Sequence, residues 1–252
     1  MNKYKLFFLK GTLEYVKKEL LEKFSDIKIY EESEEGISFE SDIKYIEEFR
    51  KLLSPISIED ESGNRIDLSK REWRKEFIPA GINPSLAYIM CMIAKLREQD
   101  ILFDPFCGSG VIPITALKYF NIKRAICSDI SGSAIEKSKK NFFTSEIDNN
   151  RFKIFRSDIK DIKLNKRNID VIISNLPFGI RVGSHDENIN SYVELEKVAN
   201  RLLRKKGKLV LLTQEKVLLR EVFKKENWDV KSILRVDEGG LFPEVFLISR
   251  KG

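Results

Sequence analysis

The sequence predicts an α/β protein, with a parallel sheet covered by helices on both faces and a small α+β unit ahead of it. Two observations predict this fold. From residue 83 onward, short apolar runs typical of buried strands alternate with longer segments of helical periodicity. Residues 1–60 instead read as β-α-β-β-α-β, which is the element order of a ferredoxin-like unit.

The predicted N-terminal unit covers residues 1–60. Its strands are expected at 4–10, 26–32, 36–41 and 55–60, and its helices at 12–24 and 42–53. The first helix is amphipathic, because Val16, Leu20 and Phe24 recur on one face. Residues 61–77 are polar and carry five Lys and Arg side chains, and we expect them to form a basic linker.

The second predicted domain covers residues 78–252. Its helices are expected at 83–98, 110–120, 133–143, 190–205 and 215–225. Its strands are expected at 101–104, 124–129, 152–158, 169–175, 208–213, 228–236 and 244–250. The Gly239-Gly240 pair before the last strand allows an antiparallel hairpin at the sheet edge.

Composition excludes several classes of protein. Hydrophobic residues make up 42% and charged residues 33% of 252 residues, as in a soluble globular protein. No apolar run approaches the ~20 residues of a membrane span, and the apolar centre of the N-terminus is too short for a signal peptide. Cys91, Cys107 and Cys127 show no CxxC spacing, which indicates a reduced, cytoplasmic protein without a zinc site.

The positive charge is unevenly distributed. Residues 1–60 hold 10 Lys and Arg against 14 Asp and Glu, a net charge of −4, which leaves +10 for the remainder of a chain whose total is +6. Such a surplus suits a polyanionic partner, and equally a solvated surface in a lysine-rich protein.

Polar or Gly-rich segments follow four successive strands of the predicted sheet. They are Asp104 with the turn "DPFCGSG", Asp129, Asp158, and "NLPFG" beginning at Asn175. Ligands bind outside the carboxyl ends of such strands. Asp129, about 20 residues after the turn, can accept both ribose hydroxyls of a nucleoside, and Asp158 can accept from an adenine amino group. We interpret the glycines of the turn as allowing close approach of the backbone to a ligand.

The order "DPFCGSG", "CSDIS", "RSDI", "NLPFG" resembles class I S-adenosylmethionine-dependent methyltransferases. More narrowly, it resembles the THUMP-containing RNA guanine-N2 methyltransferases, above all the group that methylates guanosine 6 of tRNA. "PAGINPSLA" matches that family's segment ahead of the first strand. The resemblance implies a Rossmann-like class I methyltransferase sheet, S-adenosylmethionine as cofactor, and RNA, above all tRNA, as partner. It also implies a cofactor site at Pro79, Ala80, Asp104, Phe106, Cys107, Gly108, Gly110, Asp129, Ile130, Asp158, Ile159 and Asn175.

The sequence departs from the family in two places. The THUMP domain, roughly a hundred residues in the family, has no counterpart between the two predicted domains, so a partner protein that replaces it is one expectation. After "GSG" the chain has Val111 and Thr115 where the family usually has Thr and Glu.

Asn175, Leu176, Pro177 and Phe178 are the predicted catalytic residues. The resemblance identifies "NLPFG" as a variant of the motif of amino-group methyltransferases. The Asn175 amide oxygen and the Leu176 carbonyl can accept both hydrogens of an exocyclic amine and direct its lone pair at the methyl group. Pro177 fixes the turn, and Phe178 offers a face on which the base can stack.

Predicted RNA contacts gather in the linker and beyond the catalytic motif. They are Lys70, Arg71, Arg74, Lys75 and Arg181. Trp73 either packs the linker against the second domain or touches RNA. We expect Cys107 to pack within the Gly-rich turn and His185 to lie in a surface loop.

Two alternatives to guanine-N2 methylation of RNA stay open. The same fold can methylate adenine N6 or a glutamine side chain, although Leu176 replaces the Pro that is more usual there. A methyltransferase fold can also serve as a non-catalytic RNA-binding subunit, but the intact strand-end residues argue against this. The target nucleotide and the oligomeric state do not follow from the sequence.

Overall fold

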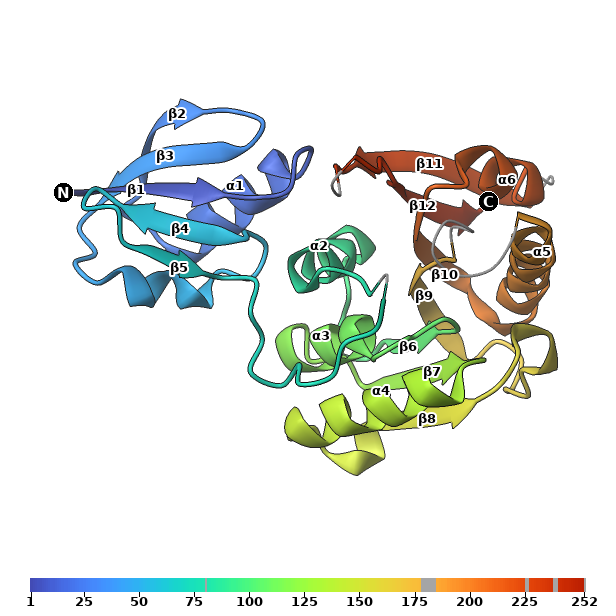
Figure 1. The fold of residues 1–252 in the computed structure, drawn as a ribbon. Helices are drawn as coiled ribbons and strands as arrows, with labels where there is room; N and C mark the ends of the chain where they lie inside the picture. Colours follow the sequence, from blue (N-terminus) through green and yellow to red (C-terminus); the bar gives the residue numbers. More distant parts are fainter. Residues whose placement is uncertain (80, 178–184, 225–226, 238–239, 252) are drawn as a thin grey trace.

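The computed structural model describes residues 1–79, 81–177, 185–224, 227–237 and 240–251. The chain forms a five-stranded sheet of order β2-β3-β1-β4-β5 and a seven-stranded sheet of order β11-β12-β10-β9-β6-β7-β8 (Figure 1). No helix in these ranges is long and apolar enough to cross a lipid bilayer.

The N-terminal unit contains all the strands of the small sheet. Its elements are β1 (Asn2–Phe7), α1 (Leu13–Lys23), β2 (Lys28–Glu32), β3 (Gly36–Ser41), the 3₁₀ helix η1 (Ile46–Lys51), β4 (Ser57–Asp60) and β5 (Arg65–Asp67). Neighbouring strands are antiparallel, and the order β2-β3-β1-β4 is that of a ferredoxin-like unit. The core lies between this sheet and its helices and includes Leu20, Phe39 and Phe49.

The prediction of a second α-helix at residues 42–53 is wrong. Within this segment only Ile46–Lys51 is helical, as the 3₁₀ helix η1. The carbonyl of Ile43 accepts hydrogen bonds at 2.7 Å from both Asn2 Nδ2 and Tyr4 Oη. The Asp42 N–H donates to Asp26 Oδ2 at 2.7 Å. These bonds anchor residues 42 and 43 to β1 and to the segment before β2, and so exclude them from a helix.

The segment 61–77 is not wholly a linker. Arg65–Asp67 forms β5 and pairs with β4, with Ile66 opposite Ile58. Three residues of the expected linker therefore belong to the small sheet, while the division of the chain at 60 and 77 stays a prediction.

The large sheet carries the remaining elements. They are α2 (Pro84–Ala94), β6 (Ile101–Asp104), α3 (Val111–Tyr119), β7 (Arg124–Asp129), α4 (Gly132–Thr144), η2 (Asn149–Arg151), β8 (Phe152–Arg156), η3 (Ile159–Asp161), β9 (Ile169–Asn175), α5 (His185–Leu202), β10 (Leu203–Thr213), α6 (Lys216–Val222), β11 (Trp228–Arg235) and β12 (Glu244–Arg250). Strands β6 to β10 pair in parallel. β12 is antiparallel to β10 and to β11, which confirms the predicted edge hairpin.

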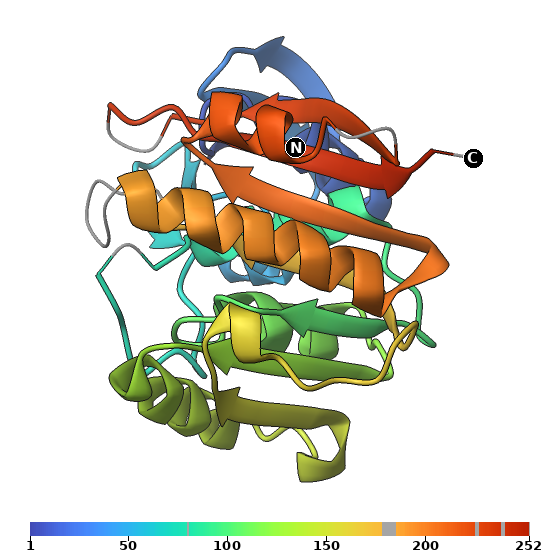
Figure 2. The same cartoon turned by 90° about the vertical axis from the view of Figure 1, so that its right-hand side faces the viewer.

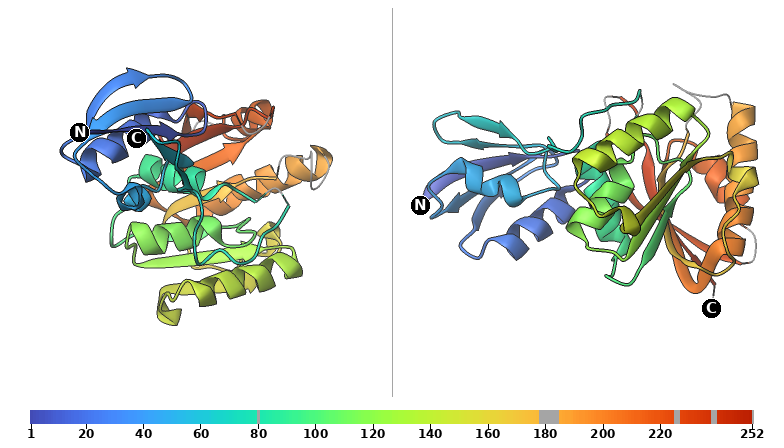
Figure 3. Two further views of the ribbon diagram at one scale, coloured as in Figure 1. Left: turned by 60° about the vertical axis from the view of Figure 1, so that its left-hand side comes forward. Right: turned by 90° about the horizontal axis from the view of Figure 1, so that it is seen from below.

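Alternate side chains of each central strand enter different cores. In β9, Val171 and Ile173 pack with α2, α3 and α4, whereas Ile172 packs with α5 and α6. Figure 3 shows the N-terminal unit on the side of α2, away from α5. The sheet is therefore buried on both faces, as the continuous apolar run of β9 predicts.

The boundary between α5 and β10 differs from the expectation. The helix was expected at 190–205, but it begins at His185 and ends at Leu202. Leu203 pairs with Ile169 of β9, and pairing resumes only at Lys208 opposite Val171. Arg204–Gly207 thus forms a bulge in β10, because Leu203 already pairs with the neighbouring strand.

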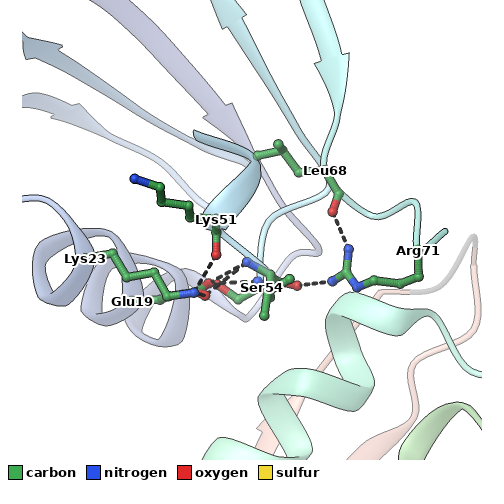
Figure 4. Close-up of polar contacts among 7 residues, drawn as sticks. Glu19, Lys23, Lys51, Ser54, Leu68 and Arg71 are labelled. Atoms are coloured by element: carbon green, nitrogen blue, oxygen red, sulfur yellow. Dashed lines mark hydrogen bonds and ion pairs between the residues drawn. The ribbon is translucent and has the colours of Figure 1, made fainter. Parts of the chain in front are cut away.

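A buried carboxylate organises the end of the N-terminal unit (Figure 4). Glu19 of α1 is 1% exposed and accepts hydrogen bonds from the Leu53 N–H, the Ser54 N–H at 2.8 Å and the Ser54 hydroxyl at 2.5 Å. Lys23 supplies the countercharge, with Nζ 2.6 Å from Glu19 Oε1. A buried carboxylate of this kind is stable only because its lone pairs are filled by donors.

Arg71 continues this network toward the large sheet (Figure 4). It is 8% exposed, and its guanidinium donates to the carbonyls of Leu68 at 2.5 Å, Lys70 at 3.1 Å and Leu53 at 2.7 Å. Burial lowers the pKa of Arg71. Nearby, the Ser85 hydroxyl of α2 donates to the Pro55 carbonyl at 2.8 Å, so the two units share polar contacts.

We predict that Glu19→Ala lowers the free energy of unfolding by about 3 kcal/mol or more, because the Leu53 and Ser54 donors lose a buried charged acceptor. The matched control is Glu22→Ala on the same helix, since Glu22 is 61% exposed and its pair with Lys18 is at the surface. The control change stays within about 0.5 kcal/mol. Urea unfolding of both variants measures this, and equal losses contradict the prediction.

Candidate functional site

The candidate site lies at the carboxyl edge of the large sheet. Asp104, Asp129 and Asn175 are the last residues of β6, β7 and β9, which are adjacent in the sheet. In Figure 2 the arrowheads of the parallel strands point to one side, and these residues end on that side. The structure thus brings together the ends of β6, β7 and β9, as the sequence predicted. The fourth predicted residue, Asp158, follows β8, which pairs with β7.

The Gly-rich turn is fastened to the end of β7. Asp129 accepts the Gly108 N–H on one carboxylate oxygen and the Ser131 N–H on the other, both at 2.9 Å. The Cys107 N–H donates to the Ser128 carbonyl at 3.0 Å. Burial raises the pKa of Asp129. Each Asp129 oxygen keeps further lone-pair capacity, so a ligand hydroxyl can still bind.

The two glycines of the turn are required for internal packing. Gly108 and Gly110 have φ values of +54° and +83°. A Cβ at Gly108 would lie 2.4 Å from Ile78 Cδ1, and one at Gly110 would lie 2.7 Å from Ser138 Oγ. The interpretation that the missing Cβ atoms make room for a ligand is therefore wrong at these positions, since protein atoms occupy the space.

Asp104 lies beneath the turn. It is 1% exposed, and its Oδ1 accepts from the Ser174 hydroxyl at 2.6 Å and the Phe106 N–H at 3.2 Å. Burial, aided by the nearby charge of Asp129, raises the pKa of Asp104 to about 7. Asp104 therefore shapes the turn from inside.

Asn141 of α4 clamps the linker onto the turn, and the sequence reasoning missed it. Its Oδ1 accepts the N–H groups of Lys75 and Glu76, both at 2.9 Å. Its Nδ2 donates to the carbonyls of Glu76 at 3.0 Å and Ser109 at 2.9 Å. The side chain is fully buried. An Asn in the middle of a predicted helix, "KKNFF", was the available signal, because such a residue often bonds to backbone elsewhere.

The open part of the edge combines an exposed apolar side chain with carboxylates. Ile130, directly after Asp129, is 61% exposed, and Pro79 is also exposed. Asp158 is half-buried and forms an ion pair with Lys160 at 3.3 Å. Ile159 packs in the core, so its side chain is not available to a ligand. An adenosine group needs an apolar contact and acceptors for its hydroxyls and amine, and these residues fit it.

The backbone after β9 is fixed on both sides. The Leu176 N–H donates to the Leu212 carbonyl at 3.0 Å, and the Leu176 side chain is buried. The Tyr192 hydroxyl lies 3.1 Å from the Pro177 carbonyl and 2.6 Å from Thr213 Oγ1. Tyr192 comes from α5 and Thr213 from the end of β10, and no sequence pattern indicated a role for either.

Three predicted site residues lie outside the described part of the chain. They are Ala80, Phe178 and Arg181. The remaining cofactor candidates near the turn are Phe106, which is half-buried, and Cys107, which is 6% exposed. Cys107 belongs to the core, which confirms it as a packing residue.

The structure separates the predicted RNA contacts of the linker. Lys70 and Lys75 are exposed, and Arg74 is half-buried with its guanidinium 4.7 Å from the Phe77 ring centroid. Arg71 does not belong with them, because its guanidinium is buried and saturated by carbonyls. We remove Arg71 from the proposed RNA-binding set for this reason.

Two open expectations are decided here. Trp73 is 3% exposed and its Nε1 donates to Tyr119 Oη at 3.3 Å, so it packs the linker against α3. His185 was expected in a loop but is the first residue of α5.

The strand order, the Gly-rich turn and the strand-end residues define a class I methyltransferase fold, a class that uses S-adenosylmethionine as methyl donor. The family model described as "RMKL-like, methyltransferase domain" matches residues 71–244. The chain belongs to this family.

Curated relatives are considerably longer than this chain. The tRNA (guanine(6)-N(2))-methyltransferase THUMP3 of Mus musculus is 26% identical over 213 residues, covering 79% of this chain and 41% of the relative. The tRNA (guanine(6)-N2)-methyltransferase of Methanocaldococcus jannaschii is 28% identical over 223 residues, covering 73% and 58%. The chain therefore spans about half the length of these relatives.

Solved structures confirm the fold. TrmN from Thermus thermophilus superposes with a TM-score of 0.86 at 15% identity, and the match covers 100% of both chains. SMU.472 complexed with SAH gives a TM-score of 0.75 at 14% identity, covering 100% of this chain and 98% of that one.

The raised pKa of Asp104 predicts a pH-dependent contribution to stability. Between its ordinary value of 3.8 and about 7, the folded state holds a proton that the unfolded chain has lost. The free energy of unfolding therefore falls as pH rises through this window and levels off above it. Asp104→Asn removes this contribution, because the amide does not titrate.

Urea unfolding of wild type and Asp104→Asn from pH 4.5 to 8 measures the difference. We expect the free energy of unfolding of wild type, relative to that of Asp104→Asn, to fall as pH rises through the window. Above about pH 7 the difference between the two proteins becomes constant. Parallel curves over the whole range contradict the prediction.

Proposed function

We propose that this chain transfers a methyl group from S-adenosylmethionine to an exocyclic amine of RNA, most specifically to guanine N2 in tRNA. The observation that carries the proposal is the fixed Asn175–Pro177 backbone at the carboxyl edge, beside the turn held by Asp129. The names of the curated relatives, which are tRNA guanine-N2 methyltransferases, support this choice of acceptor.

The residues that would hold the cofactor lie at the ends of β7 and β8 and at Pro79, ahead of α2. We assign the ribose hydroxyls to Asp129 and the adenine to Ile130, Asp158, the Ile159 backbone and Pro79. When bound, S-adenosylmethionine supplies an activated methyl group on a sulfonium. Asp104 and Asn141 act as positioning residues, because they fix the turn through the Phe106 N–H and the Ser109 carbonyl.

The acceptor amine would be held by Asn175 and by the Leu176 carbonyl. An amine conjugated to a ring is a weak nucleophile because its lone pair is delocalised. Two acceptors that bind both of its hydrogens oppose this delocalisation and aim the lone pair. This chemistry needs placement more than a strong base. The fixed backbone at Leu176 and Pro177 supplies that placement without reorganisation during the reaction.

Recognition of the RNA would extend onto Lys70, Lys75 and Arg74, near the clamped linker. We also propose a cytoplasmic location and a partner protein that supplies further RNA contacts, in the role the THUMP domain has in the family. Co-purification from cells with and without RNase treatment tests for this partner.

The experiment for the proposed function is incubation with labelled cofactor and unmodified tRNA, followed by digestion and identification of the methylated nucleoside. N2-methylguanosine is the expected product. N6-methyladenosine as the product would contradict the proposal and support methylation of adenine. Cofactor binding without any methylated product would support a non-catalytic subunit.

We predict that Asn175→Ala lowers turnover by about two orders of magnitude or more, which is the scale of losing one preorganised polar contact. Asn175→Asp retains more activity than the alanine variant, because a carboxylate still accepts both amine hydrogens. Single-turnover methylation rates measure the effect, and calorimetry with the cofactor serves as control. A normal rate for Asn175→Ala excludes this strand end as the active site.

Tyr192→Phe tests the support of the Pro177 turn. Removing the hydroxyl leaves the Pro177 carbonyl and Thr213 without this buried bond, worth about 1–3 kcal/mol. We expect turnover to fall by about 5- to 50-fold while the KM for the cofactor changes by less than about twofold.

Tyr4→Phe is the matched control for this variant. Tyr4 is also buried and donates to the Ile43 carbonyl at 2.7 Å, but it lies in the small sheet. It should lower thermal stability without lowering turnover. Equal turnover in the two variants contradicts a positioning role for Tyr192.

A further inference from the structure

A basic groove lies at the amino edge of the large sheet, opposite the candidate active site. Its volume is about 750 Å³, and six of its lining residues are Arg167, Arg204, Lys205, Lys206, Arg250 and Lys251. We call it the amino-edge groove. In Figure 2 the C-terminus and the start of β10 lie on the side away from the arrowheads of the parallel strands.

The bulge of β10 creates this concentration of charge. The step from Leu203 to Lys208 in β10 is five positions long, whereas the facing step from Ile169 to Val171 in β9 is two positions long. Three consecutive cationic residues, Arg204–Lys206, are thereby taken out of the ladder. In a regular strand successive side chains would alternate between the two faces, whereas here all three line one groove.

Three arginines are held in place at the groove. Arg204 forms an ion pair with Asp170 at 2.8 Å. Arg250 donates to the Asn200 side-chain oxygen at 2.8 Å and to its carbonyl at 2.7 Å, and Arg167 donates to the Leu203 carbonyl at 3.1 Å. Guanidinium groups held this way keep unused N–H donors, because each has five.

Three lysines lack any countercharge. Lys205, Lys206 and Lys251 are exposed, and within the described ranges they form no ion pair or side-chain hydrogen bond. Among the described residues, Asp170 forms an ion pair with Arg204, and Glu196 attracts Arg250. Burial and then the proximity of Arg167 lower the pKa of Arg250.

The positive edge continues beyond the groove. Lys95 and Arg97, which follow α2, lie close enough to Lys208 of β10 to lower its pKa, after the larger effect of burial, and Asp100 opposes them. A surface of like charges costs electrostatic free energy unless an anion binds it. Several cations along one edge fit an extended polyanion better than a single small anion.

We propose that the amino-edge groove binds the phosphate backbone of RNA at a site separate from the carboxyl edge where the methyl group would be transferred. The choice of RNA as the polyanion rests on the proposed function. β10 joins the two edges, and its 11 residues span about 35 Å or less at ~3.3 Å per residue. One RNA of about ten nucleotides or more can therefore reach both edges.

The first test compares two triple variants with the same change in net charge. Lys205→Gln/Lys206→Gln/Lys251→Gln neutralises the groove, and Lys3→Gln/Lys28→Gln/Lys44→Gln neutralises three exposed lysines of the N-terminal unit. We expect the groove variant to bind a tRNA transcript at least about tenfold more weakly and to reduce the salt slope by about 2. The control variant changes affinity by less than about threefold, and equal losses overturn the proposal.

The second test locates the RNA directly. The three native cysteines are buried, so a single cysteine from Lys206→Cys can be labelled with a photoreactive probe, with Lys44→Cys as control. Cross-links to tRNA from position 206 but not from 44 support the groove. Calorimetry with inorganic phosphate accompanies this test. Saturable phosphate binding without RNA cross-links would identify a small-anion site and overturn the proposal.

These outcomes are distinguishable from failure of the proposed function. If methyl transfer is absent but position 206 cross-links to RNA, RNA binding by the amino-edge groove is supported and the proposed methyltransferase activity is contradicted. If methyl transfer occurs and the groove variant keeps wild-type KM for tRNA, the groove proposal falls alone. In the supporting case the KM for tRNA rises while kcat at saturating tRNA is unchanged.

Discussion

Parallel strands covered by helices on both faces have no solvated face on which a polar side chain can lie. In β9 the side chains of Val171, Ile172 and Ile173 are all fully buried, in alternating cores. The first place where such a strand can expose a polar group is its end. Asp104, Asp129 and Asn175 therefore meet at one edge because burial excludes chemistry from the rest of each strand.

The residues at this edge are held by the half-buried Asp129 and by the fully buried Asn141 and Tyr192. Asp129 holds the Gly108 N–H, Asn141 holds the Ser109 carbonyl, and Tyr192 holds the Pro177 carbonyl. Each contact fixes backbone rather than a side chain. A site that works by placement depends on such support, because small displacements of the reacting groups are costly.

The basic surplus of residues 61–252 is divided among unlike environments. Arg71 ties the linker to the end of the N-terminal unit through the Leu53 carbonyl, and Lys139 and Lys140 pair with Glu136 and Glu76. By contrast, the lysines of the amino-edge groove form no ion pair within the described residues. Net charge alone therefore does not indicate where a polyanion binds, since pairing and burial decide which cations are available.

The sequence by itself determined the order of strands and helices in the large sheet and the residues at its strand ends, because both follow from local periodicity and from where apolar runs stop. The bounds of β6, β7 and β9 agree with the expected ones. Only the tertiary structure decided the burial of Arg71, the clamp by Asn141, the short η1 and the bulge of β10. Each of these depends on a partner distant in the chain, such as Ile169 for Leu203. Sequence periodicity carries no information about which distant backbone groups will need a hydrogen-bond partner once the elements pack.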